Sequence, residues 1–184
     1  RSVEDVAQTV ARMREFYRPR EQQIALTAVQ MNSLVPQVVE LTRARWKDQP
    51  LQSGIVIRAA TELAPGLPKF MGVESEIREA LTNLVFNAVD AMPAGGTLTL
   101  RTRLAGAVPE QSVVVEVVDT GVGMDEATRE RCLEPFFTTK GERGTGLGLA
   151  MVSGMVQRHS AAIEIESTPG AGTTMRLMFA VPTA

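Results

Sequence analysis

A glycine-rich segment, Gly144-Thr-Gly-Leu-Gly-Leu149, has the composition of a loop that binds phosphate through its backbone. Glycines at alternate positions leave the backbone uncovered by side chains and free to adopt positive φ. Apolar residues at helical spacing follow, so the glycines lie where a helix begins, and free N–H groups and the helix dipole favour an anion there. Lys140, just upstream, adds a full positive charge. The alternative is a flexible glycine-rich surface loop before a core helix.

Two asparagines, Asn83 and Asn87, are four residues apart and share one face of a helix predicted over residues 75–92. Asparagine is a poor residue for a helix interior, because its amide competes for backbone hydrogen bonds. Mg²⁺ takes oxygen ligands and draws only one or two of them from the protein when phosphates supply others. An amide oxygen on this helix therefore suits a Mg²⁺–phosphate site, and two solvated asparagines are the alternative.

A β-branched run over residues 113–119 ends in the carboxylate of Asp119, and the turn residues Gly121 and Gly123 follow. The pattern predicts a buried strand that delivers Asp119 to a site at its C-terminal end. An ionised aspartate accepts hydrogen bonds and cannot donate them, so it suits an exocyclic amino group such as that of adenine. A simple turn that happens to contain an aspartate is the alternative.

Hydrophobic periodicity predicts the elements that must position these residues. A helix is expected after a cap at Asn32 or Ser33, with Leu34, Val38, Leu41 and Trp46 on its buried side. The other predicted helices cover residues 2–17, 75–92, 125–133 and 147–158. The predicted strands cover residues 24–31, 55–63, 97–104, 113–119, 161–167 and 173–181. We expect an α/β two-layer sandwich, in which a mixed sheet of about five strands is covered on one face by about three helices, with an N-terminal helical appendage.

In this order, the segments resemble the ATP-binding catalytic domain of bacterial sensor histidine kinases, within the Bergerat-fold superfamily that includes gyrase, the mismatch-repair MutL proteins and a heat-shock chaperone. The resemblance covers about residues 20–184. The matching motifs are an N box (Asn83, Asn87), a first glycine box (Asp119-x-Gly121-x-Gly123), an F box (Phe136-Phe137), a second glycine box (Gly144-x-Gly146-x-Gly148) and a last one (Gly170-Ala-Gly172-Thr173).

The resemblance implies that ATP and Mg²⁺ bind between the asparagine helix and the glycine loop. Asn87 corresponds to the Mg²⁺ ligand, and Asn83 and Lys140 to the catalytic residues near the phosphates. Asp119 corresponds to the acceptor for the adenine amino group, assisted by Thr173, with Thr174 as the alternative. The nucleotide-binding set it implies is Asn83, Asn87, Asp119, Gly121, Gly123, Lys140, Gly144, Thr145, Gly146, Leu147, Gly148, Leu149 and Thr173.

The resemblance also implies a mobile lid over residues 124–145, anchored or hinged at Phe136 and Phe137. Other nucleotide-binding folds fit less well. No glycine here is followed by Lys and then Ser or Thr, as a P-loop requires. Gly121-x-Gly123 follows a strand but lacks the third glycine of a Rossmann fingerprint.

Residues 1–19 are predicted to be the C-terminal end of a dimerisation helix plus a linker, and residues 20–184 the catalytic domain. The chain opens on Arg1 rather than Met, so we expect it to be a fragment of a larger protein. The resemblance implies a phosphoacceptor histidine on the protein's own dimerisation domain outside this sequence, a homodimer at full length, and a response regulator downstream. His159, the only histidine, is interpreted as a residue at a helix C-terminus and not as the acceptor.

The net charge of −2 gives no electrostatic case for nucleic-acid binding. No apolar run approaches the roughly 18 residues needed to span a membrane, so we expect a cytoplasmic protein or the cytoplasmic part of a membrane-bound sensor. The single cysteine, Cys132, is interpreted as a small core residue.

Three other functions remain open: a gyrase-type or MutL-type ATP-hydrolysing module, an anti-sigma-type serine kinase, and a nucleotide-binding scaffold without transfer activity. In the gyrase branch a glutamate that activates water stands at the position of Asn83, and its absence here favours phosphoryl transfer to a protein.

Overall fold

A mixed five-stranded sheet forms one layer of the computed structural model, which describes residues 26–141 and 144–182. In sequence order its strands are β2 (Ile57–Leu63), β4 (Gly96–Ala105), β5 (Ser112–Asp119), β6 (Ala162–Thr168) and β7 (Gly172–Ala180). Their spatial order is β2-β4-β5-β7-β6, with β2 parallel to β4 and the other neighbours antiparallel. A separate antiparallel pair joins β1 (Thr27–Val29) to β3 (Phe70–Gly72).

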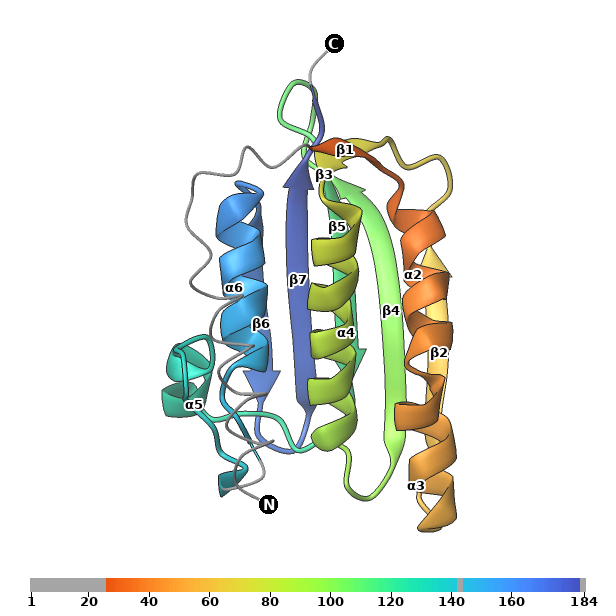
Figure 1. Ribbon diagram of the computed structural model, residues 1–184, viewed down its shortest axis with the longest axis vertical. Helices are drawn as coiled ribbons and strands as arrows, with labels where there is room; N and C mark the ends of the chain where they lie inside the picture. Colours follow the sequence, from red (N-terminus) through yellow and green to blue (C-terminus); the bar gives the residue numbers. More distant parts are fainter. Residues whose placement is uncertain (1–25, 142–143, 183–184) are drawn as a thin grey trace, which may run out of the picture.

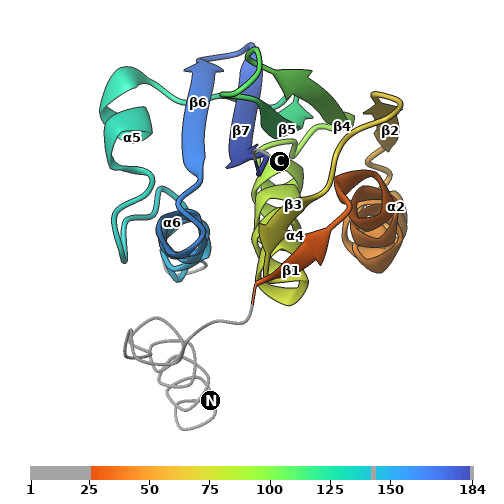
Figure 2. The same cartoon turned by 90° about the horizontal axis from the view of Figure 1, so that it is seen from above.

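Three helices, α2 (Met31–Leu41), α4 (Glu74–Asp90) and α6 (Gly148–Arg158), cover one face of this sheet (Figures 1 and 2). The short elements are the π-helix η1 (Ala44–Asp48), α3 (Gln49–Gln52) and α5 (Glu126–Arg131). Within the described residues, no helix lies on the other face of the sheet (Figure 2). The predicted α/β two-layer sandwich is therefore confirmed, while the predicted helix over residues 2–17 lies outside the described residues.

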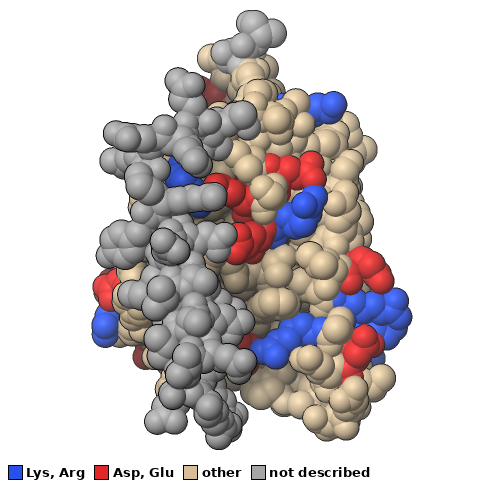
Figure 3. Space-filling view, in the orientation of Figure 1, with Lys and Arg blue, Asp and Glu red and all other residues tan. Residues whose placement is uncertain are grey.

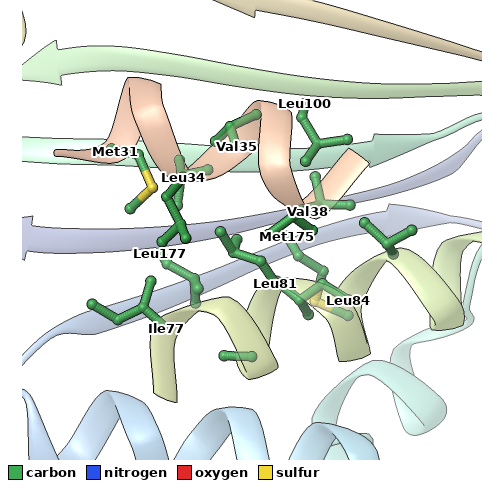
Figure 4. Packing of buried hydrophobic residues seen from close by; sticks show 14 of the residues in the cluster. Met31, Leu34, Val35, Val38, Ile77, Leu81, Leu84, Leu100, Met175 and Leu177 are labelled. Carbon is green, nitrogen blue, oxygen red and sulfur yellow. The ribbon is translucent and has the colours of Figure 1, made fainter. Parts of the chain in front are cut away.

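The core lies between the sheet and the helices, where apolar side chains from both layers interlock (Figure 4). From α2 and α4 come Met31, Leu34, Val35, Val38, Ile77, Leu81 and Leu84, and from the strands come Leu100, Met175 and Leu177. Full burial of one such side chain contributes about 1.5–3 kcal/mol. This contact fixes α4, which carries both asparagines, against the sheet.

The beginning of α2 differs from the prediction, because Asn32 is not a cap. The N-cap is Gln30, and Asn32 lies in the first turn of the helix. The Asn32 amide donates to the carbonyl oxygen of Ala64 at 2.7 Å and accepts from the Thr102 hydroxyl at 2.7 Å. The amide thus joins the helix to β4, a long-range contact that a local capping pattern cannot indicate.

The end of α2 also differs from the prediction. Leu41 was expected on the buried side but is 65% exposed, whereas Thr42 is 2% exposed. The Thr42 hydroxyl donates to the carbonyl oxygen of Val38 at 2.7 Å, which allows this polar residue to be buried where the helix ends. Trp46 lies in the π-helix that follows, half-buried, and its indole N–H donates to the carbonyl oxygen of Val39 at 3.0 Å.

The predicted strand over residues 24–31 is also shorter than expected. Within the described residues it covers only Thr27–Val29, and it pairs with β3, which was not predicted, rather than with the main sheet. Three residues are too few to display the alternation that identifies a strand.

The uncovered face of the sheet carries one row of alternating charges. Glu62, Arg101, Glu116, Arg176 and Glu164 occupy successive register positions across all five strands. The Glu62–Arg101 pair is 2.6 Å apart and the Glu116–Arg176 pair 2.8 Å. Cross-strand ion pairs of this kind stabilise a solvated sheet face modestly, by roughly 0.2–1 kcal/mol each.

The helical face shows acidic and basic side chains close together (Figure 3). Among the described residues, no helix is both long and apolar enough to cross a lipid bilayer.

Candidate functional site

A cavity of about 730 Å³ lies where α4 ends and α6 begins. These ends of the two helices are in the lower part of Figure 1. The walls of the cavity come from α4, the end of β5, the start of β7 and the segment between α5 and α6. Eleven of the predicted nucleotide-binding residues line it: Asn83, Asn87, Asp119, Gly123, Lys140, Gly144, Thr145, Gly146, Gly148, Leu149 and Thr173. The volume is that of a site for a small organic ligand.

Two predicted residues, Gly121 and Leu147, do not line the cavity. The backbone N–H of Gly121 instead donates to Asp119 Oδ1 at 2.8 Å, so Gly121 orients the carboxylate without lining the cavity itself. Leu147 is 2% exposed and is the N-cap residue of α6. Both therefore support residues of the wall.

One end of the cavity is formed by Asp119, the last residue of β5. The residue is 6% exposed, and burial raises the pKa of its carboxyl group. Hydrogen bonds from the backbone N–H groups of Gly121 and Thr173 lower this pKa and oppose part of that effect. Asp119 pairs with Thr173 across the β5–β7 register, and the Thr173 hydroxyl lies 2.8 Å from the Ser167 hydroxyl. The Asp119 carboxylate, a hydrogen-bond acceptor, and the Thr173 hydroxyl are therefore neighbours, and each is positioned by hydrogen bonds to other residues.

The chain after Asp119 packs closely against the turn between β6 and β7. Gly123 has φ +66°, and a Cβ there would lie 2.0 Å from the carbonyl oxygen of Thr168. Only glycine fits such a backbone approach. The next residue, Met124, donates its N–H to the Ser167 hydroxyl at 2.8 Å. This packing fixes the floor of the cavity beside Asp119.

The two asparagines of α4 face the start of α6. A Cβ placed on Gly148 would lie 3.7 Å from both Asn83 Oδ1 and Asn87 Nδ2, an ordinary van der Waals distance, so both amides lie next to the first residue of α6. The free N–H groups at the beginning of α6 and the two amides therefore share one wall. Glu79, one turn before Asn83, also lines the cavity.

The side-chain oxygen of Asn87 contacts the ammonium group of Lys140. The Lys140 ammonium lies 3.2 Å from Asn87 Oδ1 and 2.7 Å from Asp90 Oδ2. The Asn87 amide oxygen therefore accepts a hydrogen bond from a positively charged group. The described residues contain no group of three or more His, Cys, Asp or Glu that could hold a metal ion. A Mg²⁺ ion at Asn87 would thus take its other ligands from water and from a bound ligand, as is usual for this ion.

Arg45 and Phe86 also line the cavity, and the sequence analysis did not single them out. The Arg45 guanidinium lies 2.5 Å from Asp90 Oδ1 and 5.9 Å from the centre of the Phe86 ring. Arg45 belongs to the π-helix η1, an irregular helix type that is frequent at functional sites. No local pattern in the sequence links it to Asp90 of α4, which lies 45 residues further along the chain.

The segment between α5 and α6 is attached to the start of α6 through Phe136. Phe136 has φ +67°, and its N–H donates to the carbonyl oxygen of Gly146 at 2.9 Å. A Cβ on Gly146 would lie 2.3 Å from the carbonyl carbon of Phe136. Phe137 lines the cavity, and its ring centre is 4.5 Å from the Arg131 guanidinium. One phenylalanine thus holds the segment through its backbone and the other through its ring.

Cys132 and His159 have structural positions. Cys132 is buried, burial raises the pKa of its thiol, and the thiol donates to the carbonyl oxygen of Arg129 at 3.2 Å, although the residue also borders the cavity. His159 caps the C-terminus of α6 and does not line the cavity. Its Nε2 accepts from the N–H of Val73 at 2.9 Å, and its Nδ1 lies 2.9 Å from the carbonyl oxygen of Met155.

Comparison with known proteins agrees with this arrangement. The family model described as "Histidine kinase-, DNA gyrase B-, and HSP90-like ATPase" matches residues 72–183. The phosphate regulon sensor protein PhoR of Pseudomonas aeruginosa is 39% identical over 137 residues, which cover 72% of this chain and 30% of that protein. The signal transduction histidine-protein kinase AtoS of Escherichia coli is 27% identical over 183 residues, which cover 98% of this chain and 28% of that protein.

A solved structure shares the fold. The crystal structure of full-length ShkA in complex with AMPPNP superposes with a TM-score of 0.80 at 28% identity, over 98% of this chain and 37% of that chain. Our chain therefore spans between 28% and 37% of the length of these three relatives.

Proposed function

Since the chain belongs to the family of histidine kinase-, DNA gyrase B- and HSP90-like ATPases, we propose that it binds Mg²⁺–ATP and donates the γ-phosphoryl group to a histidine on a dimerisation domain outside this sequence. It would act as the catalytic part of a two-component signalling kinase. The observation that carries the proposal is one cavity with the buried acceptor Asp119 at one end and Asn87 with Lys140 at the other.

At the first end, Asp119 would accept a hydrogen bond from the amino group of adenine. Its geometry is set in advance, because the N–H of Gly121 already holds Oδ1 at 2.8 Å. The Thr173 hydroxyl next to it would contact the base. A buried acceptor discriminates against a ligand that lacks the amino group, because a buried polar atom without a partner is unfavourable.

At the second end, the N–H groups at the start of α6 and the Lys140 ammonium would hold the phosphates. Asn87 would supply the protein's ligand to Mg²⁺, which neutralises phosphate charge when bound. Asn83 would contact the phosphates from the same helix face. Phosphoryl transfer requires mainly positioning and charge stabilisation, and these residues supply both.

Transfer to a protein is favoured over hydrolysis by the residue at position 83. An amide does not take a proton from water near neutral pH, so Asn83 cannot act as the general base that a hydrolysing module needs. The decisive experiment mixes the chain with γ-labelled ATP and the protein's dimerisation domain. We expect acid-labile label on the added domain and little release of free phosphate. Rapid phosphate release with no labelled domain would instead identify a hydrolysing module.

The chain alone should not phosphorylate itself on His159. The His159 side chain is fully buried, and both ring nitrogens contact backbone groups of the domain, so neither nitrogen is available to a phosphate. Incubation with γ-labelled ATP followed by electrophoresis under alkaline conditions should therefore show no label on this chain. Acid-labile label that disappears in His159→Asn would contradict this assignment.

A bound ATP analogue should protect the Lys140–Gly141 peptide bond from trypsin. Lys140 would contact phosphate, and closing the segment between α5 and α6 reduces the open population that trypsin cleaves. At a ligand concentration 100 times the dissociation constant, we expect cleavage to slow by on the order of tenfold or more. The measurement is the rate of cleavage at this bond by mass spectrometry, with cleavage at other sites as the internal control. Equal rates with and without the analogue would argue against a closing segment.

In the whole protein, we expect residues 1–19 to continue from a dimerisation helix, so that two copies form a homodimer. A response regulator would then receive the phosphoryl group from the phosphorylated histidine. The site described above would serve as the cytoplasmic kinase module of that assembly.

A further inference from the structure

Asp90, in the last turn of α4, contacts two cations that come from distant parts of the chain. Its Oδ1 lies 2.5 Å from the Arg45 guanidinium and its Oδ2 lies 2.7 Å from the Lys140 ammonium. The side chain of Asp90 is 28% exposed and that of Lys140 is 38% exposed. The carboxylate therefore joins η1, α4 and the segment between α5 and α6 at one point.

The contact with Asp90 determines where the Lys140 ammonium lies. Asn87 and Asp90 are three residues apart on α4 and share one helix face. Their oxygens hold the same ammonium group, at 3.2 Å from Asn87 Oδ1 and 2.7 Å from Asp90 Oδ2. The shorter contact is the charged one, so Asp90 is the stronger of the two partners. Asp90 thereby places Lys140 on the amide oxygen that the proposed function assigns to Mg²⁺.

The other cation, Arg45, fixes Asp90 itself. The Arg45 guanidinium contacts Oδ1, and the Phe86 ring supports it at 5.9 Å. This leaves Oδ2 directed to Lys140. The carboxylate is therefore held in one orientation by a residue that does not contact Asn87.

We propose that Asp90 is a positioning residue that keeps Lys140 on Asn87 while the nucleotide site is empty. We call the contact among Asp90, Lys140 and Asn87 the lysine latch. A metal ion and the ammonium would compete for the Asn87 oxygen, so Lys140 would leave it when Mg²⁺ and nucleotide bind, and its charge would then be free to contact phosphate. Only this release step rests on the proposed function; the latch itself rests on the contacts above.

The latch should be weak enough to open readily. Partly exposed ion pairs shift an equilibrium by about 1.5- to 5-fold, because water screens them and the side chains lose freedom. Removing the Asp90 charge should therefore increase the population of free Lys140 by about the same factor. It should not destabilise α4, since a negative charge in the last turn of a helix opposes the helix dipole.

Trypsin cleavage of nucleotide-free protein tests the latch directly, because trypsin must take up the Lys140 side chain. We expect the Lys140–Gly141 bond to be cleaved about 1.5- to 5-fold faster in Asp90→Asn than in the wild type. Glu126→Gln is the matched control: it removes one carboxylate from α5, at a side chain that is 79% exposed, and should leave the rate unchanged. Equal rates for wild type and Asp90→Asn would overturn the latch, whether or not the chain binds nucleotide.

Binding of a Mg²⁺–ATP analogue distinguishes the latch from a general effect of charge. Asp90→Asn should tighten binding by a similar factor, and this effect should vanish in a Lys140→Met background, where there is no latch to release. Tightening that persists in that background would overturn the proposal in favour of general electrostatics. Weaker binding by Asp90→Asn would also overturn the proposal, because it would indicate that Asp90 is a metal ligand. A wild type that binds no nucleotide would instead refute the proposed function, and the cleavage comparison would still decide the latch.

Discussion

Replacing Asp119 with asparagine should weaken the binding of ATP and ADP by about 10- to 150-fold while the fold persists. The proposed contact is a buried hydrogen bond between a carboxylate and the adenine amino group, and such charge-assisted bonds contribute roughly 1.5–3 kcal/mol. The asparagine can still accept from the N–H of Gly121 through its Oδ1, but its NH₂ group then faces the amino group donor to donor. Isothermal titration calorimetry with ADP measures the change.

Glu116→Gln is the matched control for this substitution. Glu116 lies on the same strand and is similarly buried at 7% exposed, but it is part of the charge row on the opposite face of the sheet. Its replacement should lower the melting temperature, because Arg103 and Arg176 each lose their ion pair with the Glu116 carboxylate, and should leave ADP affinity unchanged. An unchanged dissociation constant in Asp119→Asn, with a normal circular dichroism spectrum, would remove Asp119 from the site.

The same carboxylate predicts how affinity depends on pH. Burial raises the pKa of Asp119, so the protonated form accumulates at a higher pH than for an exposed aspartate. A protonated oxygen carries a hydrogen and no longer accepts from the adenine amino group. Affinity for ADP should therefore fall as the pH is lowered through the raised pKa. In Asp119→Asn, this fall in affinity at low pH should be absent. Measuring ADP affinity against pH for the wild type and for the variant therefore isolates the contribution of the Asp119 carboxyl group.

Asn87→Ala should weaken nucleotide binding in Mg²⁺ and leave binding in EDTA nearly unchanged. We assign Asn87 to the metal, and loss of an oxygen that contacts a cation is worth on the order of tenfold or more in affinity. Without the metal the residue has no charged partner in the ligand, so its removal has little effect. Calorimetry of ADP binding gives the ratio of the dissociation constants of variant and wild type, once in Mg²⁺ and once in EDTA.

Arg78→Ala provides the comparison on the same helix. Arg78 pairs with Glu74 on the surface of α4 and does not line the cavity. Its replacement should therefore leave the dissociation constant for ADP unchanged both in Mg²⁺ and in EDTA. If Asn87→Ala weakened binding equally in Mg²⁺ and in EDTA, the residue would contact the nucleotide itself or support the packing of α4, and the metal would need another ligand.

The sequence was sufficient to predict elements that have a long, regular pattern. Helix α4 was predicted over residues 75–92 and covers Glu74–Asp90, because its apolar stripe repeats over four turns. Strand β5 was predicted from a continuous β-branched run that is buried on both faces. Residues of the glycine loop were placed correctly at the start of α6, because alternating glycines followed by an apolar helical pattern have few other interpretations.

Features that depend on contacts between distant segments could not be predicted. Asn32 resembled a cap because its type is favoured there, and only the structure brings it to Ala64 and Thr102. Nothing near Asp90 in the sequence indicates that Arg45 and Lys140 flank it in the structure. In these cases the partner is set by how the helices pack on the sheet, which local patterns do not encode.

The charge row on the uncovered face has a consequence for how the sheet reaches its correct alignment. A slip of β7 by two residues would keep every side chain on its own face, so the hydrophobic core would tolerate it better than a slip by one. Such a slip would move Arg176 from Glu116 to Val114 or Val118, and the Glu116–Arg176 ion pair would be lost. It would also move Thr173 away from Asp119. The ion pair on the uncovered face therefore helps to set the register between β5 and β7. The same register aligns Asp119 with Thr173, the two residues proposed to contact adenine on the other face of the sheet.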